Sequence, residues 1–228
     1  MKLSIIVPVY NEEKTVKEII RRVMAVPLSI EKEIIIVDDF STDSTKEILK
    51  KIDNKNINIV YHSKNQGKGS AIRTGIKYTT GDIIIIQDAD LEYNPEEYPK
   101  LIQPILDGKT KVVYGSRYKG KITGPNLLSH LYGNKLLTFI TKLLYFQNIS
   151  DMETCYKVLK KEVLNNINLK AKRFDFEPEI TAKIIKKGFK IYEVPITYQS
   201  RLFDEGKKIT WRDGIKALYY LIKYRFTN

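Results

Sequence analysis

The sequence predicts an α/β protein with an open, mostly parallel sheet flanked by helices, and two observations lead to this prediction. Over the first 115 residues, short runs rich in Ile and Val alternate with stretches in which apolar residues recur at helical spacing. The Ile and Val runs are nearly continuous in hydrophobicity, as in parallel strands that are buried on both faces. Strand–helix–strand repetition on this scale is typical of such a sheet.

The strands and helices of the first half can be assigned from these patterns. Strand-like runs occur at residues 3–9, 33–38, 57–61, 82–87 and 111–114. Helical stripes lie between them, at Val16, Ile19, Ile20 and Val23, at Thr45, Ile48, Leu49 and Ile52, and at Ala71, Ile72, Gly75 and Ile76. Asn11 and Ser41 are the expected N-cap residues of the first two helices.

The pattern changes from about residue 120. Residues 127–146 predict a long amphipathic helix, and residues 151–159 predict a polar loop that leads into a strand. A further helix is expected at 177–187 and an extended segment, interrupted at Pro195, at 189–198. Residues 211–226 predict a final amphipathic helix with aromatic and basic residues.

Length and composition predict a single domain over residues 1–228. Hydrophobic residues make up 43% of the 228 positions, which is enough for one sizeable core. Charged residues make up 29%, which argues against a wholly disordered chain. The single cysteine, Cys155, has no partner for an internal disulfide, which indicates a reducing compartment. We expect it to be a small buried side chain rather than a catalytic thiol.

No segment has the pattern of a signal peptide or of a membrane span. The N-terminus is short in apolar residues and reaches Pro8 early. Residues 127–146 come closest to the roughly 18 to 20 apolar residues that a span needs, but polar and charged residues interrupt them. We therefore expect a soluble cytoplasmic protein that can lie at the cytoplasmic face of a membrane.

Polar and acidic residues follow three of the predicted strands. The strand ends read Pro8-Val9-Tyr10-Asn11-Glu12, Asp38-Asp39 and Asp88-Ala89-Asp90. Ligands of open α/β sheets bind outside the carboxyl ends of the strands. These groups are therefore expected to meet at one rim of the sheet and to form a binding site.

Asp88 and Asp90 are candidate metal ligands. Two carboxylates separated by one residue at a strand end can bind a hard cation, Mg²⁺ or Mn²⁺, which then neutralises a diphosphate. Glu92 could supply a third oxygen. The alternative is an acidic turn after a strand, because a lone Asp-x-Asp is common in loops.

Asp38 and Asp39 are adjacent carboxylates, which repel each other unless both have partners. The hydrogen-bond donors of a nucleotide base or ribose could serve as such partners. The alternative, N-capping of the following helix, accounts for one of the two but not for both.

With these motifs the chain resembles glycosyltransferase family 2, whose members have the GT-A fold, and within it the dolichyl-phosphate mannose synthase and polyprenyl-phosphate glycosyltransferase group. The resemblance covers residues 3–225. It is carried by Val7-Pro8-Val9-Tyr10-Asn11-Glu12, Val37-Asp38-Asp39-Phe40-Ser41-Thr42-Asp43, Asn65-Gln66-Gly67-Lys68-Gly69, Asp88-Ala89-Asp90-Leu91-Glu92, Gly115-Ser116-Arg117-Tyr118, Asp151-Met152-Glu153-Thr154-Cys155-Tyr156-Lys157, Phe174-Asp175-Phe176-Glu177-Pro178-Glu179 and Gly206-Lys207-Lys208-Ile209. Each motif is modest alone, but their order and spacing are specific together.

The resemblance implies a nucleotide-sugar-binding half at residues 1–118 and an acceptor-binding half at 119–228. The implied pocket for the base and ribose consists of Pro8, Tyr10, Asn11, Glu12, Val37 and Asp39. Lys68 matches a position beside the nucleotide, and Asp88-Ala89-Asp90 matches the segment that binds the metal and the nucleotide-sugar. Asp90 and Arg117 are the implied catalytic residues, with Arg117 as a ligand of the acceptor phosphate.

Two departures from the family pattern concern the acceptor half. Close relatives carry a second arginine on the helix that corresponds to residues 126–146, where this chain offers His130 or Lys135 instead. The usual glycine in the loop after Asp151 is replaced by Cys155. Glu92 also stands where relatives often have glutamine, which adds a negative charge beside the metal pair.

The acceptor is expected to be a polyprenyl or dolichyl phosphate. Transfer to a hydroxyl needs a general base, whereas a phosphomonoester is already a dianion and needs cations to position it. Those cations are Arg117, Arg201, Lys207 and Lys208. The Gln-x-x-Arg-Trp motif of processive polysaccharide synthases is absent from the sequence. The transferred sugar is mannose or glucose, from GDP-mannose or UDP-glucose, with inversion at the anomeric carbon.

The rival enzyme is a soluble transferase that acts on a sugar or protein hydroxyl. It would use Asp151 or Glu153 as the base. For both residues the structural alternative is loop capping or an ion pair with the basic half of the chain.

Charge is unevenly distributed along the chain. Residues 1–108 carry 15 Lys and Arg against 17 Asp and Glu, whereas residues 109–228 carry 24 against 10. The basic half and the aromatic and basic residues of segment 211–226 suit an anionic membrane surface. Alternatively, the apolar face of that segment, which includes Trp211, Ile215 and Leu221, packs on the domain itself. A membrane-anchoring subunit is a further expected partner, and nucleic acid is not expected, because the acidic rim would repel a polyanion.

Overall fold

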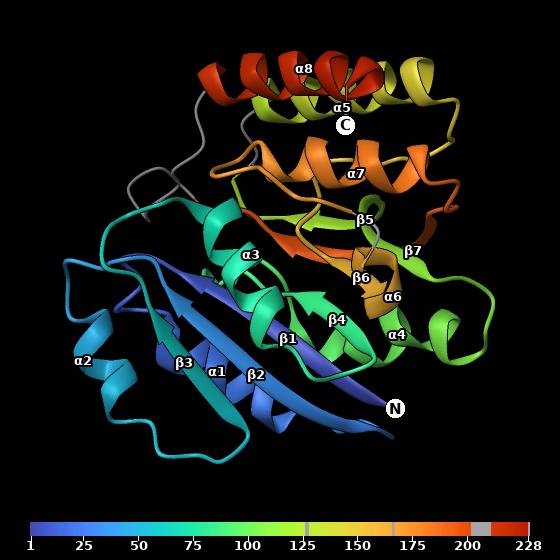
Figure 1. Cartoon of the computed structure of the whole chain (residues 1–228). Helices are drawn as coiled ribbons and strands as arrows, with labels where there is room; N and C mark the ends of the chain where they lie inside the picture. Colours follow the sequence, from blue (N-terminus) through green and yellow to red (C-terminus); the bar gives the residue numbers. More distant parts are fainter. Residues whose placement is uncertain (126–127, 166, 202–210, 228) are drawn as a thin grey trace.

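A single twisted sheet forms the centre of the computed structural model, which describes residues 1–125, 128–165, 167–201 and 211–227 (Figure 1). Its seven strands lie in the order β3-β2-β1-β4-β6-β5-β7. The strands are β1 (Lys2–Val9), β2 (Glu31–Asp38), β3 (Ile57–Tyr61), β4 (Ile83–Ile86), β5 (Val112–Thr123), β6 (Lys157–Lys160) and β7 (Tyr192–Gln199).

The sheet is mostly parallel, as the sequence predicts. The pairs β1–β2, β2–β3, β1–β4 and β5–β7 are parallel, and β6 alone runs antiparallel to its neighbours β4 and β5. The strands β1 and β4 are almost wholly buried because helices cover both faces of the sheet at this point. Their carboxyl ends therefore meet side by side at one rim.

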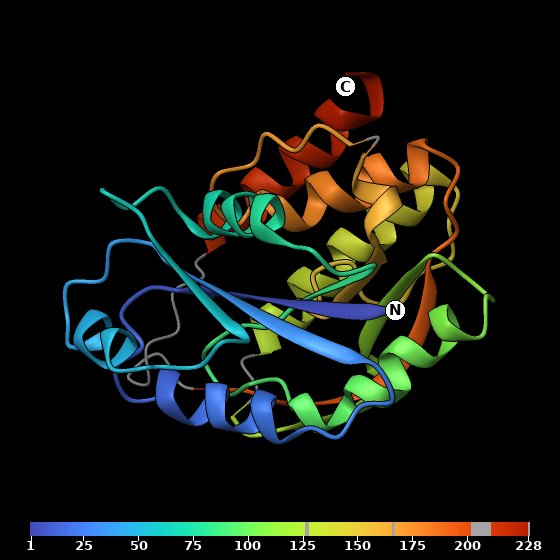
Figure 2. The ribbon, with the colours of Figure 1, turned by 60° about the horizontal axis from the view of Figure 1, so that its bottom comes forward.

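Helices lie on both faces of the sheet (Figure 2). On one side are α1 and α4, and on the other are α3, α7 and α8. The helices of the described chain are α1 (Val16–Ala25), α2 (Thr45–Lys50), α3 (Lys68–Tyr78), the 3₁₀ turn η1 (Pro95–Glu97), α4 (Tyr98–Leu106), α5 (Leu128–Tyr145), α6 (Lys161–Asn165), α7 (Phe176–Lys186) and α8 (Trp211–Phe226).

The two N-cap predictions are wrong. Helix α1 begins at Val16, and Asn11 lies five residues earlier with φ of 51°. Its side chain accepts a hydrogen bond from the Thr42 backbone N–H. Helix α2 begins at Thr45, and the Ser41 hydroxyl donates to Asp38 instead of capping the helix. The polar residues of these two loops bind one another across the rim of the sheet.

Helix α5 and helix α8 form an outer layer, with α7 between them and the sheet (Figure 1). In the described part of the chain, no helix is both long enough and apolar enough to cross a bilayer. The apolar face of α8 that the sequence predicts is divided in the structure. Leu221 is fully buried, whereas Ile215 and Ile222 are exposed.

Candidate active site

A cavity of about 590 Å³ opens at the carboxyl ends of β1 and β4. Its walls come from distant parts of the chain, because α5 and α8 close the side that lies opposite the strand ends. The predicted donor, metal and acceptor-phosphate residues that line it are Pro8, Tyr10, Glu12, Asp39, Lys68, Asp88, Ala89, Asp90, Glu92, Arg117 and Arg201. The predicted rim is thus a real cavity.

Two predicted site residues lie outside the cavity lining, and two fall outside the described residues. Val37 is fully buried and packs with Ile35 and Ala71 inside the fold. Asn11 is outside the cavity lining and bonds to Thr42, as described above. Lys207 and Lys208 lie outside the described residues.

Asp38 and Asp39 both have partners within the protein. Asp38 accepts hydrogen bonds from the hydroxyl and the backbone N–H of Ser41. Asp39 accepts from the backbone N–H groups of Gln66 and Gly67, at 2.8 and 2.7 Å, and lies 2.7 Å from His62 Nδ1. The carboxylate of Asp39 therefore holds the loop that leads into α3.

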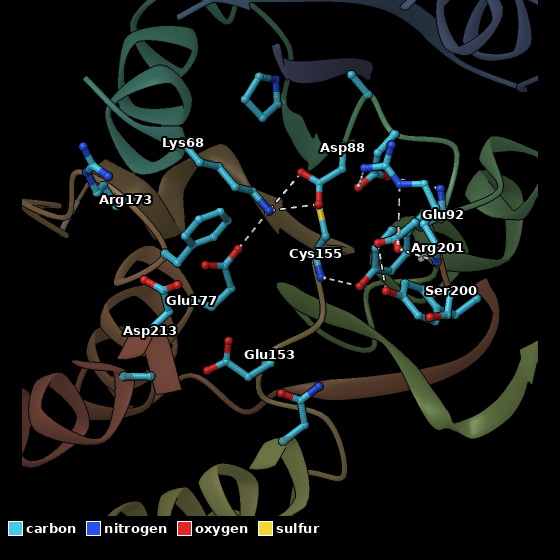
Figure 3. Close-up of a pocket in the computed structure, with 18 of the residues that line it drawn as sticks. Lys68, Asp88, Glu92, Glu153, Cys155, Arg173, Glu177, Ser200, Arg201 and Asp213 are labelled. Atoms are coloured by element: carbon cyan, nitrogen blue, oxygen red, sulfur yellow. Dashed lines mark hydrogen bonds and ion pairs between the residues drawn. The ribbon is translucent and has the colours of Figure 1, made fainter. Parts of the chain in front are cut away.

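That loop positions Lys68 at the first turn of α3. Gly67 has φ of 93° and ψ of 161°, a conformation that is accessible almost only to glycine. The chain then turns so that Lys68 Nζ lies 2.9 Å from Asp88 and 3.2 Å from Glu177 Oε1 (Figure 3). The ammonium group thus connects the strand-end carboxylates with a carboxylate of α7.

Asp90 lies in a strongly acidic environment. Burial, followed by the charges of Asp88 and Glu92, raises its pKa to about 8. The Arg201 guanidinium partly offsets this, because its Nη2 lies 3.2 Å from Asp90 and its Nη1 3.5 Å from Glu12. Arg201 therefore acts as the positive counterpart of this carboxylate cluster.

Glu92 is engaged with the protein at both oxygens. Its Oε2 accepts from the Tyr198 hydroxyl at 2.8 Å, and its Oε1 accepts from the Arg201 backbone N–H at 3.0 Å. Across the described ranges, no group of three or more His, Cys, Asp or Glu side chains is arranged to hold a metal ion. Asp88 and Asp90 remain as a pair of candidate ligands.

Arg117 projects from β5 and forms a bidentate ion pair with Asp151. Its Nε and Nη2 each donate to an oxygen of Asp151 at 2.8 Å. Asp151 is fully buried, and the guanidinium lies over the ring of Tyr198 at 5.1 Å. These two bonds use two of the five N–H donors of the guanidinium. Asp151 is therefore engaged in an ion pair with a residue of the basic half of the chain, which is the alternative to a role as general base.

Two cavity residues, Glu153 and Glu177, have buried oxygens without a hydrogen-bond partner. Oε1 of Glu153 and Oε2 of Glu177 are in this state. Burial, followed by the charge of Glu177, raises the pKa of Glu153 to about 8. The sequence indicates Glu153 only as an alternative general base for a hydroxyl acceptor, and it indicates no role for Glu177. No sequence spacing relates Glu177 to Lys68, because they lie on different helices.

Cys155 lines the cavity but is buried and close to Asp88. Burial and this negative charge raise the pKa of its thiol well above the ordinary value. The side chain is therefore held as a thiol, which suits a packing role rather than a nucleophilic one.

Comparison with known proteins places the chain in a family. Residues 4–167 match the model of glycosyl transferase family 2. The chain belongs to glycosyltransferase family 2. It is 31% identical in sequence to a dolichol-phosphate mannosyltransferase of Pyrococcus furiosus, and the alignment covers 98% of this chain and 64% of that relative. The chain thus spans slightly under two-thirds of the length of that relative.

A second relative matches over nearly its whole length. It is a UDP-N-acetylglucosamine–dolichyl-phosphate N-acetylglucosaminyltransferase of Methanococcus voltae, 31% identical over 96% of this chain and 94% of the relative. Among solved structures, the fold is similar to that of glucosyl-3-phosphoglycerate synthase from Mycobacterium tuberculosis in complex with Mn²⁺, UDP and phosphoglyceric acid. The TM-score is 0.72 at 19% identity, over 100% of this chain and 79% of that one. The GT-A fold is thereby confirmed.

The residues of this family 2 member fit a divalent cation. Mg²⁺ is usually held by one or two carboxylates together with substrate phosphates, rather than by an all-protein cage. Asp88 and Asp90 supply two carboxylates. The pKa of Asp90 is raised by burial first and then by the negative charges of Asp88 and Glu92, and a bound cation would offset those charges. The donor set is therefore appropriate for Mg²⁺ or Mn²⁺.

Proposed function

We propose that this glycosyltransferase transfers a hexose from a nucleotide-sugar to the phosphate of a polyprenyl or dolichyl lipid, with inversion at the anomeric carbon. The observation that carries the proposal is the composition of the cavity. It combines a carboxylate pair for a metal-bound diphosphate, three arginines of which Arg117 and Arg201 are held by carboxylates, and the inner sides of two helices whose outer sides expose apolar stripes. Both curated relatives described above are named for transfer to dolichyl phosphate.

The two arginines suit a phosphate acceptor. Arg117 and Arg201 both line the cavity, and guanidinium groups bind phosphate oxygens through planar, bidentate hydrogen bonds. Each is held by carboxylates that fix its orientation, Asp151 for Arg117 and Asp90 for Arg201. The acceptor phosphate is expected to bind between these guanidinium groups.

The transfer step needs no proton movement. An oxygen of the phosphate dianion attacks the anomeric carbon of the hexose, and the bond from that carbon to the diphosphate breaks. The electron pair leaves with the nucleoside diphosphate, and the attack from the opposite side inverts the configuration. When bound, the cation supplies electrostatic stabilisation of the departing diphosphate. Asp88 and Asp90 are the residues that would hold it, and Lys68 adds a positive charge 2.9 Å from Asp88.

Arg117 already engages one of the two candidate general bases for a hydroxyl acceptor. Asp151, the first candidate base, is fully buried and has both oxygens bonded to Arg117. Neither oxygen is therefore free to take a proton from a hydroxyl, which argues against Asp151 as the base. Glu153 remains the candidate base for a sugar or protein hydroxyl, whereas a phosphate acceptor needs no base.

The outer faces of α5 and α8 suit a membrane surface. Both helices expose a stripe of large apolar side chains at helical spacing: Tyr132, Leu136, Phe139, Leu143 and Phe146, and Ile215, Tyr219, Ile222 and Phe226. Exposed cations flank the stripes, among them Lys135, Lys216, Lys223 and Arg225. Apolar and cationic side chains on one surface bind anionic bilayers.

The same helices border the cavity. Leu131, Asn134 and Leu137 of α5 and Asp213, Gly214 and Ala217 of α8 belong to its lining. A lipid phosphate could therefore reach the arginines while its chain stays in the bilayer that contacts α5 and α8. This arrangement provides a peripheral protein with access to an acceptor that is embedded in a membrane.

The test is transfer of radiolabelled sugar into an organic-extractable product. GDP-mannose and UDP-glucose are supplied in turn, with polyprenyl phosphate in vesicles, with and without Mn²⁺. Metal-dependent label in the organic phase is expected from one of these donors, and Asp90→Ala and Arg117→Ala should each lower it by at least 100-fold. Metal-dependent hydrolysis of the donor without any lipid product would overturn the phosphate acceptor.

A further inference from the structure

The cavity contains a second set of carboxylates, on the side of Lys68 that faces away from Asp88. Glu153, Glu177 and Asp213 lie on this side, as Figure 3 shows. They come from the loop before β6, from the first turn of α7 and from the start of α8. The transfer chemistry proposed above uses none of the three.

Glu177 has the clearest sign of a missing ligand. Only 5% of the surface of this residue is exposed. Its Oε1 lies 3.2 Å from Lys68 Nζ, but its Oε2 has no hydrogen-bond partner. Oε1 of Glu153 is likewise buried without a partner. A buried, unsatisfied carboxylate oxygen costs free energy, so it is normally found bonded. Both residues face the cavity, where a ligand can supply the donors.

The chemistry of the site excludes several ligands. A phosphate would be repelled by the carboxylate of Glu177, and a lipid chain would leave the free oxygens of Glu153 and Glu177 unpaired. A second metal ion is not supported, because nowhere in the described chain are three or more His, Cys, Asp or Glu side chains arranged to hold one. A group with several neutral hydrogen-bond donors fits, and vicinal sugar hydroxyls have this character because one carboxylate can accept from two of them.

We propose that Glu153 and Glu177 bind hydroxyl groups of the transferred hexose and thereby select the donor sugar. The inference rests on the proposed use of a nucleotide-sugar, and it assigns the sugar to the side of Lys68 opposite the Asp88–Asp90 pair. Lys68 then links the two subsites, because it bonds to Asp88 on one side and to Glu177 on the other. The high pKa of Glu153 is consistent with a carboxyl group that lacks donors until a ligand binds.

The test compares the affinity for a nucleotide-sugar with that for the nucleotide alone. Calorimetric titrations with UDP-glucose, UDP, GDP-mannose and GDP are made with the full chain and Mn²⁺, without any lipid. The variants are Glu153→Gln and Glu177→Gln, and the control is Glu162→Gln, which removes an exposed carboxylate of α6 that pairs with Lys111. Gln keeps the size of the side chain and removes the charge.

Each site variant should weaken binding of the preferred nucleotide-sugar by about 10- to 100-fold, as expected when a buried polar group of the site loses its hydrogen bond to the ligand. Binding of the matching diphosphate should stay within about twofold in all variants. A donor that lacks the bonded hydroxyl should bind wild type and variant equally, which a purely structural role of the two residues would not produce.

Three outcomes would contradict the inference. The first is unchanged affinity for the nucleotide-sugar in both variants. The second is an equal loss for nucleotide-sugar and diphosphate, which would show that Glu177 acts only by holding Lys68. In these two cases the wild type still binds donor, so the proposed function stands. The third, wild type that binds neither nucleotide-sugar, would overturn the proposed function as well.

Discussion

At the scale of single residues, the site depends on carboxylates that have very different partners. Asp151 is fully paired with Arg117, Asp39 holds the loop before α3, and Glu153 and Glu177 each have an oxygen without a partner. Residue type alone does not distinguish these cases. The environment of each carboxylate determines whether it supports the fold or is available to a ligand.

Replacing Asp151 tests its role as the partner of Arg117. Asp151→Asn leaves a buried guanidinium without a full counter-charge, so the free energy of unfolding should fall by about 3 kcal/mol. The exposed pair Glu162–Lys111 provides the control, because Glu162→Gln should change stability by less than about 1 kcal/mol. Urea denaturation measures both. A variant that keeps its stability but loses the acidic limb of its pH–rate profile would instead identify Asp151 as a general base.

Glu153 should make the stability of the protein depend on pH. In the folded state its pKa is about 8, so it keeps its proton up to about that pH. In the unfolded chain it should lose the proton near the ordinary glutamate pKa of about 4.3. The folded state therefore binds more protons between these values, and the contribution of Glu153 to stability falls as the pH rises through this window.

Glu153→Gln removes that dependence. The free energy of unfolding of wild type minus that of the variant should fall between pH 5 and pH 8 by up to about 1.4 kcal/mol per pH unit. Denaturation at several pH values gives this difference. Parallel curves for the two proteins would show that Glu153 is ionised in the folded state throughout.

The sequence predicts one part of the site and misses another for a physical reason. Asp88 and Asp90 follow a buried strand directly, so strand topology alone places them at the rim. Glu177 lies in the first turn of α7, where an acidic residue is expected from the helix dipole alone. Its approach to Lys68 depends on how α7 packs beside α3, which no local pattern reveals. The partners of Asp38 and Asp39 were missed for the same reason.

At the scale of elements, helix α8 has two functionally different faces. Leu221 is fully buried against α5 and α7, while Ile222, the next residue, is 45% exposed. Successive residues of a helix point about 100° apart, which places the buried set with Ala217 and Tyr224 and the exposed set with Ile215 and Tyr219. The sequence predicts one broad apolar face, because residue type alone does not distinguish an apolar side chain that is buried from one that is exposed.

Substitutions on the two faces should separate stability from membrane binding. Leu221→Ala should lower the free energy of unfolding by about 2–5 kcal/mol, because it opens a cavity in the core. The double variant Leu143→Ser/Ile222→Ser should leave stability within about 1 kcal/mol, since both side chains are exposed. It should weaken binding to vesicles with anionic lipids by about tenfold or more, as expected for two apolar anchors. Co-sedimentation with unchanged binding would show that this face does not contact the bilayer.

The loop before α3 depends on glycine at one position. In Gly67→Ala the new Cβ would lie 2.4 Å from the Lys172 carbonyl oxygen, in a backbone conformation with φ of 93°. Gly108 also has a positive φ, 71°, but a Cβ there meets nothing within 4 Å. Gly108→Ala should therefore cost about 1–2 kcal/mol from backbone strain alone, and Gly67→Ala should cost more.

The readout is chemical denaturation of both variants, with nucleotide binding as a second measurement. Gly67→Ala should also weaken nucleotide binding, because it displaces Lys68. Equal losses of stability in the two variants would show that the contact with Lys172 relaxes without cost.

Prediction from local sequence fails at one helix that contains prolines and at two loops whose polar side chains bond to other loop residues. Helix α4 is not predicted, because its nine residues contain Pro99 and Pro104. Pro99 lies at the helix start, where its missing N–H is harmless, and only Pro104 is internal. The cap predictions at Asn11 and Ser41 are wrong because both side chains have other partners: Asn11 accepts from Thr42 in the opposite loop, and Ser41 donates to Asp38 three residues earlier.

At the scale of the whole molecule, the sheet and the outer helices perform different tasks. The carboxyl end of β4 leads into Asp88 and Asp90, which we propose to hold a metal-bound diphosphate, and β5 supplies Arg117. Helices α5 and α8 close the cavity and expose apolar stripes to the outside. The parallel sheet was predictable from alternating strand and helix patterns, whereas the position of the outer helices depends on packing between distant segments. In the proposed function, the cavity lies between a water-soluble donor and a membrane-embedded acceptor.

The linkage formed in the product tests the central claim most directly. Polyprenyl phosphate is incubated in vesicles with the protein, Mn²⁺ and the donor that it uses, and the lipid is examined by ³¹P NMR and mass spectrometry. The account predicts that the phosphomonoester signal is replaced by that of a phosphodiester, with the mass of one added hexose. A lipid whose phosphate remains a monoester, while the hexose appears on a hydroxyl of any other acceptor, would contradict it.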